Sequence, residues 1–419
     1  MSLWSRLLAW IRGWFAPRPR IRDVSRLDPS AAVDEVVRTD PVPWKEGRRR
    51  IVYRDPRLLP KPPVTWPAKH KPVMANDEAR RLFAGTLRTK NRHIRDLLPD
   101  EAQLARLGLP VWRTEADVAT ALGISVGMLR HLSIHRFREK TPHYVQYAIP
   151  KRTGGERLIT APKRRMKAAQ RRLLGLLVDR LPLAEPAHGF RAGRSVKTGA
   201  EPHVGKAVVV HLDLSDFFHR VTYARVRGYL LGCGYGFPVA ATLAALCTES
   251  ERQPVDLGDG VVHVPVGERR CVQGAPTSPG ICNAIAAKLD RRIAGLARAH
   301  GFAYTRYADD IALSGDDAGK AWGLVQAVRR IAAEEGFPIN EEKTRILRRG
   351  QRQEVTGVVV NDVLGLSRKD RRILRAVVHR TNAAKEPTLD RAALDGKLAY
   401  LAMLNPEQAK PLQERLKKG

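Results

Sequence analysis

Two adjacent acids, Asp309 and Asp310, stand in the otherwise apolar segment FAYTRYADDIALSG, residues 302–315. A segment this apolar is expected to be buried, yet neighbouring carboxylates in a protein interior repel each other and lose hydration. The pattern predicts a strand, a turn at the acids and a second strand. The fold must therefore leave that turn in water or bring positive charge to it.

A third acid ends a second apolar run. Asp213 follows the hydrophobic strand pattern of AVVVHLDLSDFF, residues 207–218. A strand end and a hairpin turn can lie together on one sheet, and three clustered carboxylates are unstable unless hard cations neutralise them. Two Mg²⁺ ions roughly 3.5–4 Å apart can activate an attacking 3′-oxygen and stabilise the departing pyrophosphate. The three acids therefore predict a two-metal site for phosphoryl transfer.

The charge of the chain indicates the kind of partner. Its 419 residues carry a formal net charge of +31, which favours a nucleic-acid partner over a membrane. With 43% hydrophobic residues it is expected to be mostly globular, in two to four structural units. The four cysteines are widely spaced, without a CxxC pair, which favours reduced core residues of a cytoplasmic protein over a zinc site or disulfides.

The N-terminal part has its own composition. MSLWSRLLAWIRGWFAPRPR, residues 1–20, predicts an amphipathic helix too short to cross a bilayer, and we expect no transmembrane segment. We favour docking of this helix on the protein or on a partner, with a membrane-surface helix as the alternative. Residues 16–75 are rich in Pro and Arg and predict an extended basic arm, which either holds RNA or is solvated.

Helix and hairpin signals follow. TEADVATALGISVGMLRHLS, residues 114–133, predicts a helix-turn-helix with Thr114 and Ser125 as caps and Gly123 at the turn. Taken alone, this segment favours a DNA-binding regulator. The alternative is a helical hairpin that serves only for packing. Further predictions are a hairpin at 147–162 around Gly154-Gly155, a basic helix at 162–181 and a helix starting at Ser278-Pro279 and ending near Gly301.

Four motifs occur in an order that resembles reverse transcriptases. They are HLDLSDFF (211–218), QGAPTSPGICN (273–283), YADD (307–310) and GFPINEEKTRI (336–346), and the resemblance covers roughly residues 105–419. It implies an α+β fold of the right-hand polymerase type, with fingers, a palm whose antiparallel sheet packs on helices, and a helical thumb. We expect an N-terminal extension at 1–105, fingers at 106–205, a palm at 206–361 and a thumb at 362–419.

The resemblance and the chemistry of the acids together assign catalytic roles. Asp213 and Asp309 are expected to hold two Mg²⁺ ions with the Leu214 backbone carbonyl, and Asp310 to be more peripheral. Phe218 stands five residues after Asp213, where the family places its sugar gate. A bulky ring there would clash with a ribose 2′-OH and so favour dNTPs, unless Phe218 is plain core filler.

Five further residues are expected at the nucleotide. Lys151 and Arg157 on the predicted hairpin are candidates to bind the triphosphate, with a solvated charged tip as the alternative. Gln273 and Gly274 would line the nucleotide site, unless they form an ordinary helix-entry loop. Lys343 is a candidate proton donor to pyrophosphate.

Other segments narrow the resemblance to retron enzymes. AHGFRAGRSVKTGAEPH, residues 187–203, is close to the Gly-Phe-x-x-Gly-Arg-Ser segment that retron and group II intron enzymes share. GAEPH matches the retron signature Asn-Ala-x-x-His at Ala200 and His203, with Gly199 in place of Asn, and VTG at 355–357 matches another. Candidate RNA-binding residues are His203, Thr356, Gly357, Arg368, Lys369, Arg371, Arg372 and Arg375.

The resemblance to retron reverse transcriptases implies partners and a product. Such an enzyme copies part of a structured noncoding RNA into single-stranded DNA from dNTPs. It starts from a guanosine 2′-OH, gives a branched RNA–DNA hybrid (msDNA) and serves antiphage defence, usually with an effector protein. The alternatives are another bacterial or group II intron-like reverse transcriptase, a polymerase-like scaffold, or a non-enzymatic helix-turn-helix regulator that leaves the three acids unexplained.

Overall fold

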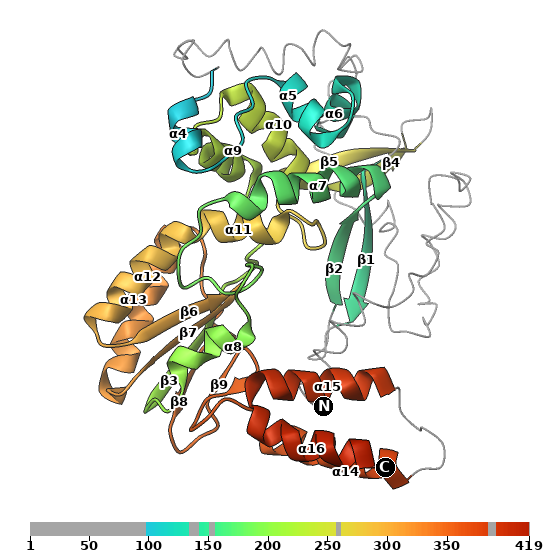
Figure 1. Cartoon of the computed structure of the whole chain (residues 1–419). Helices are drawn as coiled ribbons and strands as arrows, with labels where there is room; N and C mark the ends of the chain where they lie inside the picture. Colours follow the sequence, from blue (N-terminus) through green and yellow to red (C-terminus); the bar gives the residue numbers. More distant parts are fainter. Residues whose placement is uncertain (1–97, 134–141, 151–155, 257–260, 384–390, 419) are drawn as a thin grey trace. The chain divides into compact units, whose positions relative to one another are not determined.

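The computed structural model describes residues 98–133, 142–150, 156–256, 261–383 and 391–418. The predicted N-terminal helix, the basic arm and Lys151 lie outside these residues. The chain divides into two compact units. The first takes Leu183–Ser215 and the described residues from Ala286 onward, and the second takes the described residues up to Pro182 together with Asp216–Ile285 (Figure 1). The chain therefore leaves the first unit after Ser215 and returns to it at Ala286.

A four-stranded antiparallel sheet is the centre of the first unit. Its strands, in spatial order, are β6 (Ala303–Tyr307), β7 (Asp310–Gly315), β3 (Val208–Asp213) and β8 (Arg345–Arg348). β3 lies between two neighbours, which explains why its apolar run is almost continuous and almost fully buried. Helices α12 (Ala287–Ala299) and α13 (Ala321–Glu334) pack against β6 and β3 (Figure 1).

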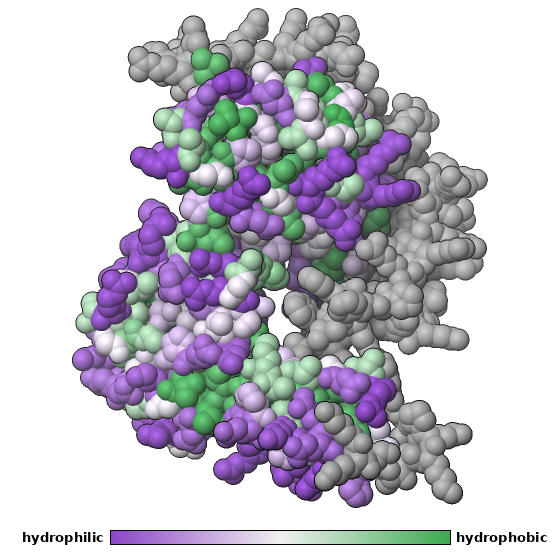
Figure 2. Space-filling model, in the orientation of Figure 1, coloured by the Kyte–Doolittle hydropathy of each residue, from purple (hydrophilic) through white to green (hydrophobic). Residues whose placement is uncertain are grey.

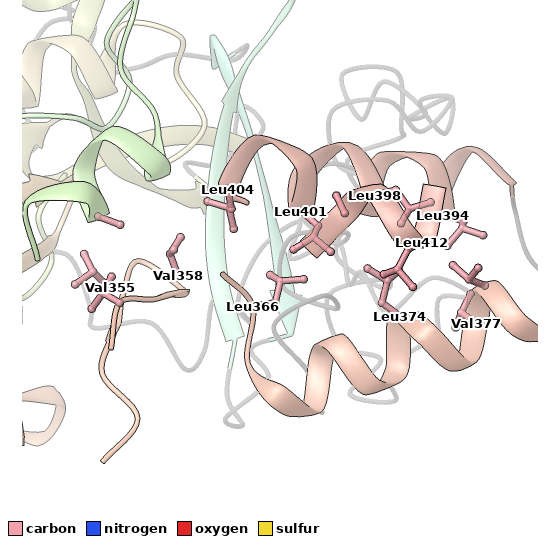
Figure 3. Close-up of a cluster of buried hydrophobic side chains, with 14 of the residues drawn as sticks. Val355, Val358, Leu366, Leu374, Val377, Leu394, Leu398, Leu401, Leu404 and Leu412 are labelled. Carbon is pink, nitrogen blue, oxygen red and sulfur yellow. The ribbon is translucent and has the colours of Figure 1, made fainter. Parts of the chain in front are cut away.

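The C-terminal helices share a core with this sheet. They are α14 (Arg368–Ala383), α15 (Arg391–Leu404) and α16 (Pro406–Lys418). One cluster of buried side chains joins Val209 and Ala312 of the sheet to side chains of the three helices. Leu374, Leu398 and Leu412 are its members on the helices that Figure 3 labels. Each such side chain contributes roughly 1.5–3 kcal/mol when fully buried. The region expected as thumb therefore depends for its core on the sheet expected as palm.

Short elements between the sheet and these helices complete the first unit. They are α8 (Val196–Ala200), the 3₁₀ turns η4 (Glu201–His203), η5 (Ala318–Lys320) and η6 (Glu341–Lys343), and the two-residue strands β9 (Glu354–Val355) and β10 (Val358–Val359).

The predicted helix-turn-helix is confirmed in the second unit. Helix α5 covers Glu115–Leu122 and α6 covers Val126–Ser133, with Gly123 between them at φ 61°. The Thr114 side chain accepts a hydrogen bond from the amide of Asp117, as its predicted cap role requires. Leu122 and Leu129 are completely buried, and both helices pack on α10 (Phe237–Cys247). This burial is typical of a packing hairpin.

The hairpin predicted at 147–162 is also observed, and it is longer than predicted. Strands β1 (Tyr144–Pro150) and β2 (Glu156–Pro162) pair along their whole length. The second unit further contains α4 (Glu101–Arg106), α7 (Arg164–Leu176), η3 (Val178–Arg180), α9 (Tyr223–Gly232), α11 (Ser278–Ile285) and a hairpin of β4 (Glu249–Asp256) and β5 (Val261–Arg270).

The prediction of one continuous helix from Ser278 to about Gly301 was wrong. The segment from Ser278 to Gly301 forms two helices, α11 and α12, separated at Ala286. The division between the two compact units falls at this same point, so the first helix and the second pack in different cores. Periodicity within the segment carries no sign of that division. No helix among the described residues combines the length and the hydropathy that crossing a bilayer requires.

Candidate active site

The three acids meet at one end of the central sheet. Asp213, the last residue of β3, lies directly opposite Asp310, the first residue of β7, and Asp310 lies opposite Tyr307 of β6. Residues directly opposite on antiparallel strands project from the same face of a sheet. Tyr307, Asp310 and Asp213 therefore form one row across three strands. The amide of Leu214 donates to the Asp309 carbonyl at 2.9 Å, which fixes the hairpin turn to the end of β3.

Positive charge does reach this turn. The Lys343 Nζ donates to Asp213 Oδ1 at 2.8 Å, and the Asp213 side chain is only 7% exposed while that of Lys343 is 57% exposed. His211 Nε2 lies 3.7 Å from Asp310 Oδ1, but burial lowers the pKa of His211, so this ring adds no positive charge at pH 7. Burial, followed by the repulsion of the Asp310 and Asp213 carboxylates, raises the pKa of Asp309 to about 6. The site therefore holds more negative charge than its own cations neutralise.

A buried ion pair supports the turn from beneath. Ala308 has a positive φ of 56°, which is unfavourable for a residue with a β-carbon. Arg306 Nη1 donates to the Ala308 carbonyl at 2.8 Å, while its Nε and Nη2 donate to Asp290 on α12. The Tyr304 hydroxyl donates to the same carboxylate at 2.7 Å. Sequence analysis missed this network, although an arginine inside a buried strand is itself a sign that an acid must lie nearby.

The oxygen atoms at this site fit a divalent metal. Carboxylates and backbone carbonyls are the ligands that Mg²⁺ prefers, and Asp213, Asp309 and Leu214 offer both kinds. Burial, and then repulsion by Asp310 and Asp213, raise the pKa of Asp309, and a bound cation would offset both effects. As the side chains stand, no three His, Cys, Asp or Glu residues within the described ranges converge on one metal position. Lys343 Nζ donates to one of the two carboxylate oxygens of Asp213.

Of the residues predicted to contact the nucleotide, Arg157, Gln273 and Gly274 belong to the second unit, whereas Lys343 belongs to the first. The Thr160 amide on β2 donates to the Gln273 carbonyl at 2.8 Å, so the Gln273 loop is attached to the strand that carries Arg157. Gly274 has a φ of 122°, and a β-carbon there would lie 2.9 Å from the Thr160 carbonyl oxygen. Only glycine therefore allows this close approach. Arg157 is exposed, and Lys151 lies outside the described residues.

Phe218 also belongs to the second unit. Its half-buried ring packs edge-on against Phe217, with the ring centroids 5.6 Å apart.

The expectation that His203 contacts RNA needs correction. His203 is 0% exposed, and its two ring nitrogens bond to the hydroxyl groups of Ser314 and Thr305 at 2.7 and 2.8 Å. Burial lowers the pKa of this histidine to about 3, so the ring is neutral at pH 7. The signature residue therefore links η4 to strands β6 and β7 and presents no surface to a ligand.

The second signature, VTG, forms a tight turn. Thr356 and Gly357 have φ of 45° and 81° and connect β9 to β10. Two consecutive residues with positive φ are typical of the type I′ turn that joins twisted antiparallel strands. Both residues are half-buried, so they retain some surface for a ligand.

The predicted basic face of α14 lies at the surface. Arg368, Lys369, Arg372 and Arg375 are exposed and Arg371 is half-buried. Arg371 and Arg375 also line a cavity of about 310 Å³ together with Arg415 of α16. The helices α14 to α16 carry many hydrophilic residues on their visible outer face (Figure 2).

Comparisons with known proteins agree with this arrangement. A family described as "Reverse transcriptase (RNA-dependent DNA polymerase)" matches residues 149–366. The Retron Mx65 reverse transcriptase of Myxococcus xanthus is 57% identical over 100% of this chain and 99% of its own length. The Retron Mx162 reverse transcriptase of the same organism is 37% identical over 94% of this chain and 83% of its own. The Retron Ec86 reverse transcriptase of Escherichia coli is 32% identical over 69% of this chain and 84% of its own.

Proposed function

The chain belongs to the retron reverse transcriptases and is an RNA-directed DNA polymerase, and on that premise we propose that it makes a branched RNA–DNA hybrid. It copies part of a structured noncoding RNA into single-stranded DNA and starts from the 2′-OH of an internal guanosine. The observation that supports the polymerase site is the row of Tyr307, Asp310 and Asp213, with Asp309 bonded through its carbonyl to Leu214. The family depends on divalent metal ions.

Asp213 and Asp309, with the Leu214 carbonyl, would hold two Mg²⁺ ions, and Asp310 is the peripheral acid. When bound, such ions lower the barrier for attack of a hydroxyl oxygen on the nucleotide phosphate and stabilise the pyrophosphate that leaves. Lys343 would give a proton to the departing pyrophosphate, because its ammonium lies beside Asp213 and is 57% exposed.

The incoming dNTP would be held by residues of the second unit. Lys151 and Arg157 bind its triphosphate, because guanidinium and ammonium groups form charge-assisted hydrogen bonds to phosphate oxygens. Gln273 and Gly274 line the nucleotide site, and the absence of a side chain at Gly274 lets this loop lie against the Thr160 carbonyl of β2. The half-exposed ring of Phe218 excludes a ribose 2′-OH.

The template RNA would be held by α14. Its exposed side chains Arg368, Lys369, Arg372 and Arg375 neutralise phosphates, as the net charge of +31 favours. Thr356 and Gly357 lie close in the chain to this helix and take part in the same contact. We further propose that the protein works in the cytoplasm, that its product is an msDNA, and that it serves antiphage defence with an effector protein.

The test of this function is polymerisation on the RNA encoded beside the gene. Purified protein should incorporate dNTPs only with Mg²⁺, and the Asp309→Asn/Asp310→Asn double variant should lose incorporation by at least about 10³-fold, the loss expected for removing a main electrostatic element of catalysis. Asp316→Asn/Asp317→Asn is the matched control, since these adjacent acids are exposed and lie just beyond β7. Incorporation that survives the first double variant would contradict the two-metal assignment.

The branch is tested on the product itself. A debranching enzyme should release the DNA from the RNA and change its mobility on a denaturing gel. A protein that extends only linear primers on the same RNA would be a different bacterial or group II intron-like reverse transcriptase.

A further inference from the structure

An exposed aromatic ring stands beside the row of catalytic side chains. Phe190 is 42% exposed, and its ring centroid lies 6.3 Å from that of Tyr307. Tyr307 occupies the same face of the sheet as Asp310 and Asp213. Phe190 is the exposed ring of this pair.

The segment before Phe190 is built against the catalytic turn. A β-carbon on Gly189 would lie 2.8 Å from the Ala308 amide nitrogen, so only glycine fits there. The His188 amide donates to the Arg306 carbonyl at 2.8 Å, and the Arg306 amide donates to the Pro186 carbonyl at 2.8 Å. The segment thus runs beside β6 as a short parallel addition to the sheet. Backbone bonds at Pro186 and His188 therefore attach the segment that leads into Phe190 to β6, beside the catalytic turn.

The backbone of Phe190 is unfavourable for the residue that occupies it. Its φ is 55°, in the left-handed region that glycine adopts readily and a bulky aromatic residue rarely adopts. Strain of this kind is retained at functional sites when the surrounding structure holds it. The ring remains substantially exposed, so burial does little to offset the strain. A glycine would hold the same loop at lower free energy, and fold stability therefore does not explain the aromatic side chain.

We propose that Phe190, supported by Tyr307, is a stacking platform for the nucleotide that carries the attacking hydroxyl. This inference rests on the proposed polymerase function, because it places that nucleotide beside Asp213 and Asp309. Every base presents a π-face, so an aromatic platform holds the end of the growing strand whatever its sequence. The same platform serves the priming guanosine and each deoxynucleotide that follows it. Phe190 is therefore a positioning and binding residue and takes no part in proton transfer.

The test separates binding from stability with a series of substitutions. Phe190→Leu keeps an apolar side chain and removes the π-face, Phe190→Gly removes the ring and the strain, and Phe190→Trp keeps an aromatic platform. We expect the Leu and Gly variants to bind a primer–template duplex about 5- to 100-fold more weakly, as stacking energies predict, and the Trp variant to stay close to the wild type. Binding is measured by fluorescence anisotropy with Ca²⁺ or without metal, so it does not depend on catalysis.

The melting temperature distinguishes the proposal from a purely structural role of Phe190. If the ring served only the fold, its removal would lower the melting temperature. The melting temperature of Phe190→Gly without nucleic acid should equal or exceed that of the wild type, while its affinity falls. Trp322→Leu is the matched control, since Trp322 is 59% exposed on α13, and its affinity should not change. Wild-type affinity in Phe190→Leu, or a lower melting temperature in Phe190→Gly, would overturn the proposal. Failure of the polymerase function would instead appear as absent incorporation by the wild type while these binding differences remain.

Discussion

Arg306 and Asp290 form an ion pair in which both side chains are fully enclosed, with Nη2 and Oδ2 2.6 Å apart. The pair joins β6 to α12 below the catalytic turn. Its third contact, from Arg306 Nη1 to the Ala308 carbonyl, holds the one turn residue with strained backbone. The pair therefore links the stability of the fold to the geometry of the site.

We expect Asp290→Asn to lower the free energy of unfolding by about 3–5 kcal/mol, because it leaves a buried guanidinium without its partner. The apolar replacement Asp290→Leu/Arg306→Met should recover much of that loss, since it removes both charges together. Its incorporation rate should stay low, because the Ala308 carbonyl has lost its donor. Urea denaturation and steady-state incorporation measure the two effects. A double variant with wild-type kcat would show that the contact to Ala308 has no catalytic importance.

We expect Lys343 to compete with a metal ion for Asp213, because its ammonium already pairs with that carboxylate. Lys343→Gln should lower the Mg²⁺ concentration for half-maximal incorporation by up to about 5-fold, since the ammonium is largely exposed and such pairs contribute about 0.2–1 kcal/mol. The maximal rate should fall, because a proton donor contributes roughly 10²- to 10⁴-fold. Lys320→Gln, at an exposed lysine paired with Asp317, is the control. A higher Mg²⁺ requirement in Lys343→Gln would contradict this competition.

His203 makes the first unit sensitive to acid. The folded-state pKa of about 3 lies below the ordinary value of 6.5, so below pH 6.5 the unfolded chain binds a proton that the folded chain does not. Its contribution to stability is complete above pH 6.5 and is lost as the pH falls toward 3. The slope reaches about 1.4 kcal/mol per pH unit.

His203→Gln cannot titrate and should flatten this dependence between pH 6 and pH 4 in urea denaturation. His188, whose pKa burial also lowers, adds to the same slope, and His188→Gln shows how much. An unchanged slope in His203→Gln would mean that His203 is protonated without penalty in the folded protein.

Phe218 is expected to select the sugar of the incoming nucleotide. Phe218→Ala should lower the ratio of kcat/KM for dNTPs over rNTPs by roughly 10- to 200-fold, the range that removal of a steric contact gives in a nucleotide or amino-acid pocket. Phe217→Leu is the control. Because Phe217 is only 3% exposed, its replacement should lower stability without changing the ratio of kcat/KM values. Equal ratios in the wild type and Phe218→Ala would leave Phe218 as a packing residue.

Local signals in the sequence were sufficient for the centre of the first unit. The two apolar runs that contain Asp213 and Asp310 became neighbouring strands, because a continuous apolar run needs a partner on each side and the acids stand at corresponding ends. Capping residues and a glycine likewise placed the helix-turn-helix, since these features act over three or four residues. The resemblance of the motifs to a known family then indicated what the row of Tyr307, Asp310 and Asp213 does. Strand pairing alone would not indicate this function.

Contacts between distant segments could not be predicted in the same way. Asp290 looks like one acid of a surface helix, and only the packing of α12 on β6 makes it the partner of Arg306. His203 looked available to RNA because a histidine between Pro202 and Val204 carries no sign of its burial. The predicted helix is divided at Ala286 because its two parts belong to different compact units. The hydrophobic periodicity of the sequence does not show this division.

The antiparallel pairing of β3 with β7 also has a consequence for how the protein is made. The chain leaves the first unit after Ser215 and builds residues 216–285 of the other unit before it returns. On the ribosome, the buried valines of β3 emerge first and wait for β7 and β8 to be translated. A nascent chain that ends before Asp309 lacks two of the three acids and the whole of β7. The row of Asp213, Asp310 and Tyr307 can therefore form only after about three quarters of the 419 residues have been translated, when β7 has emerged.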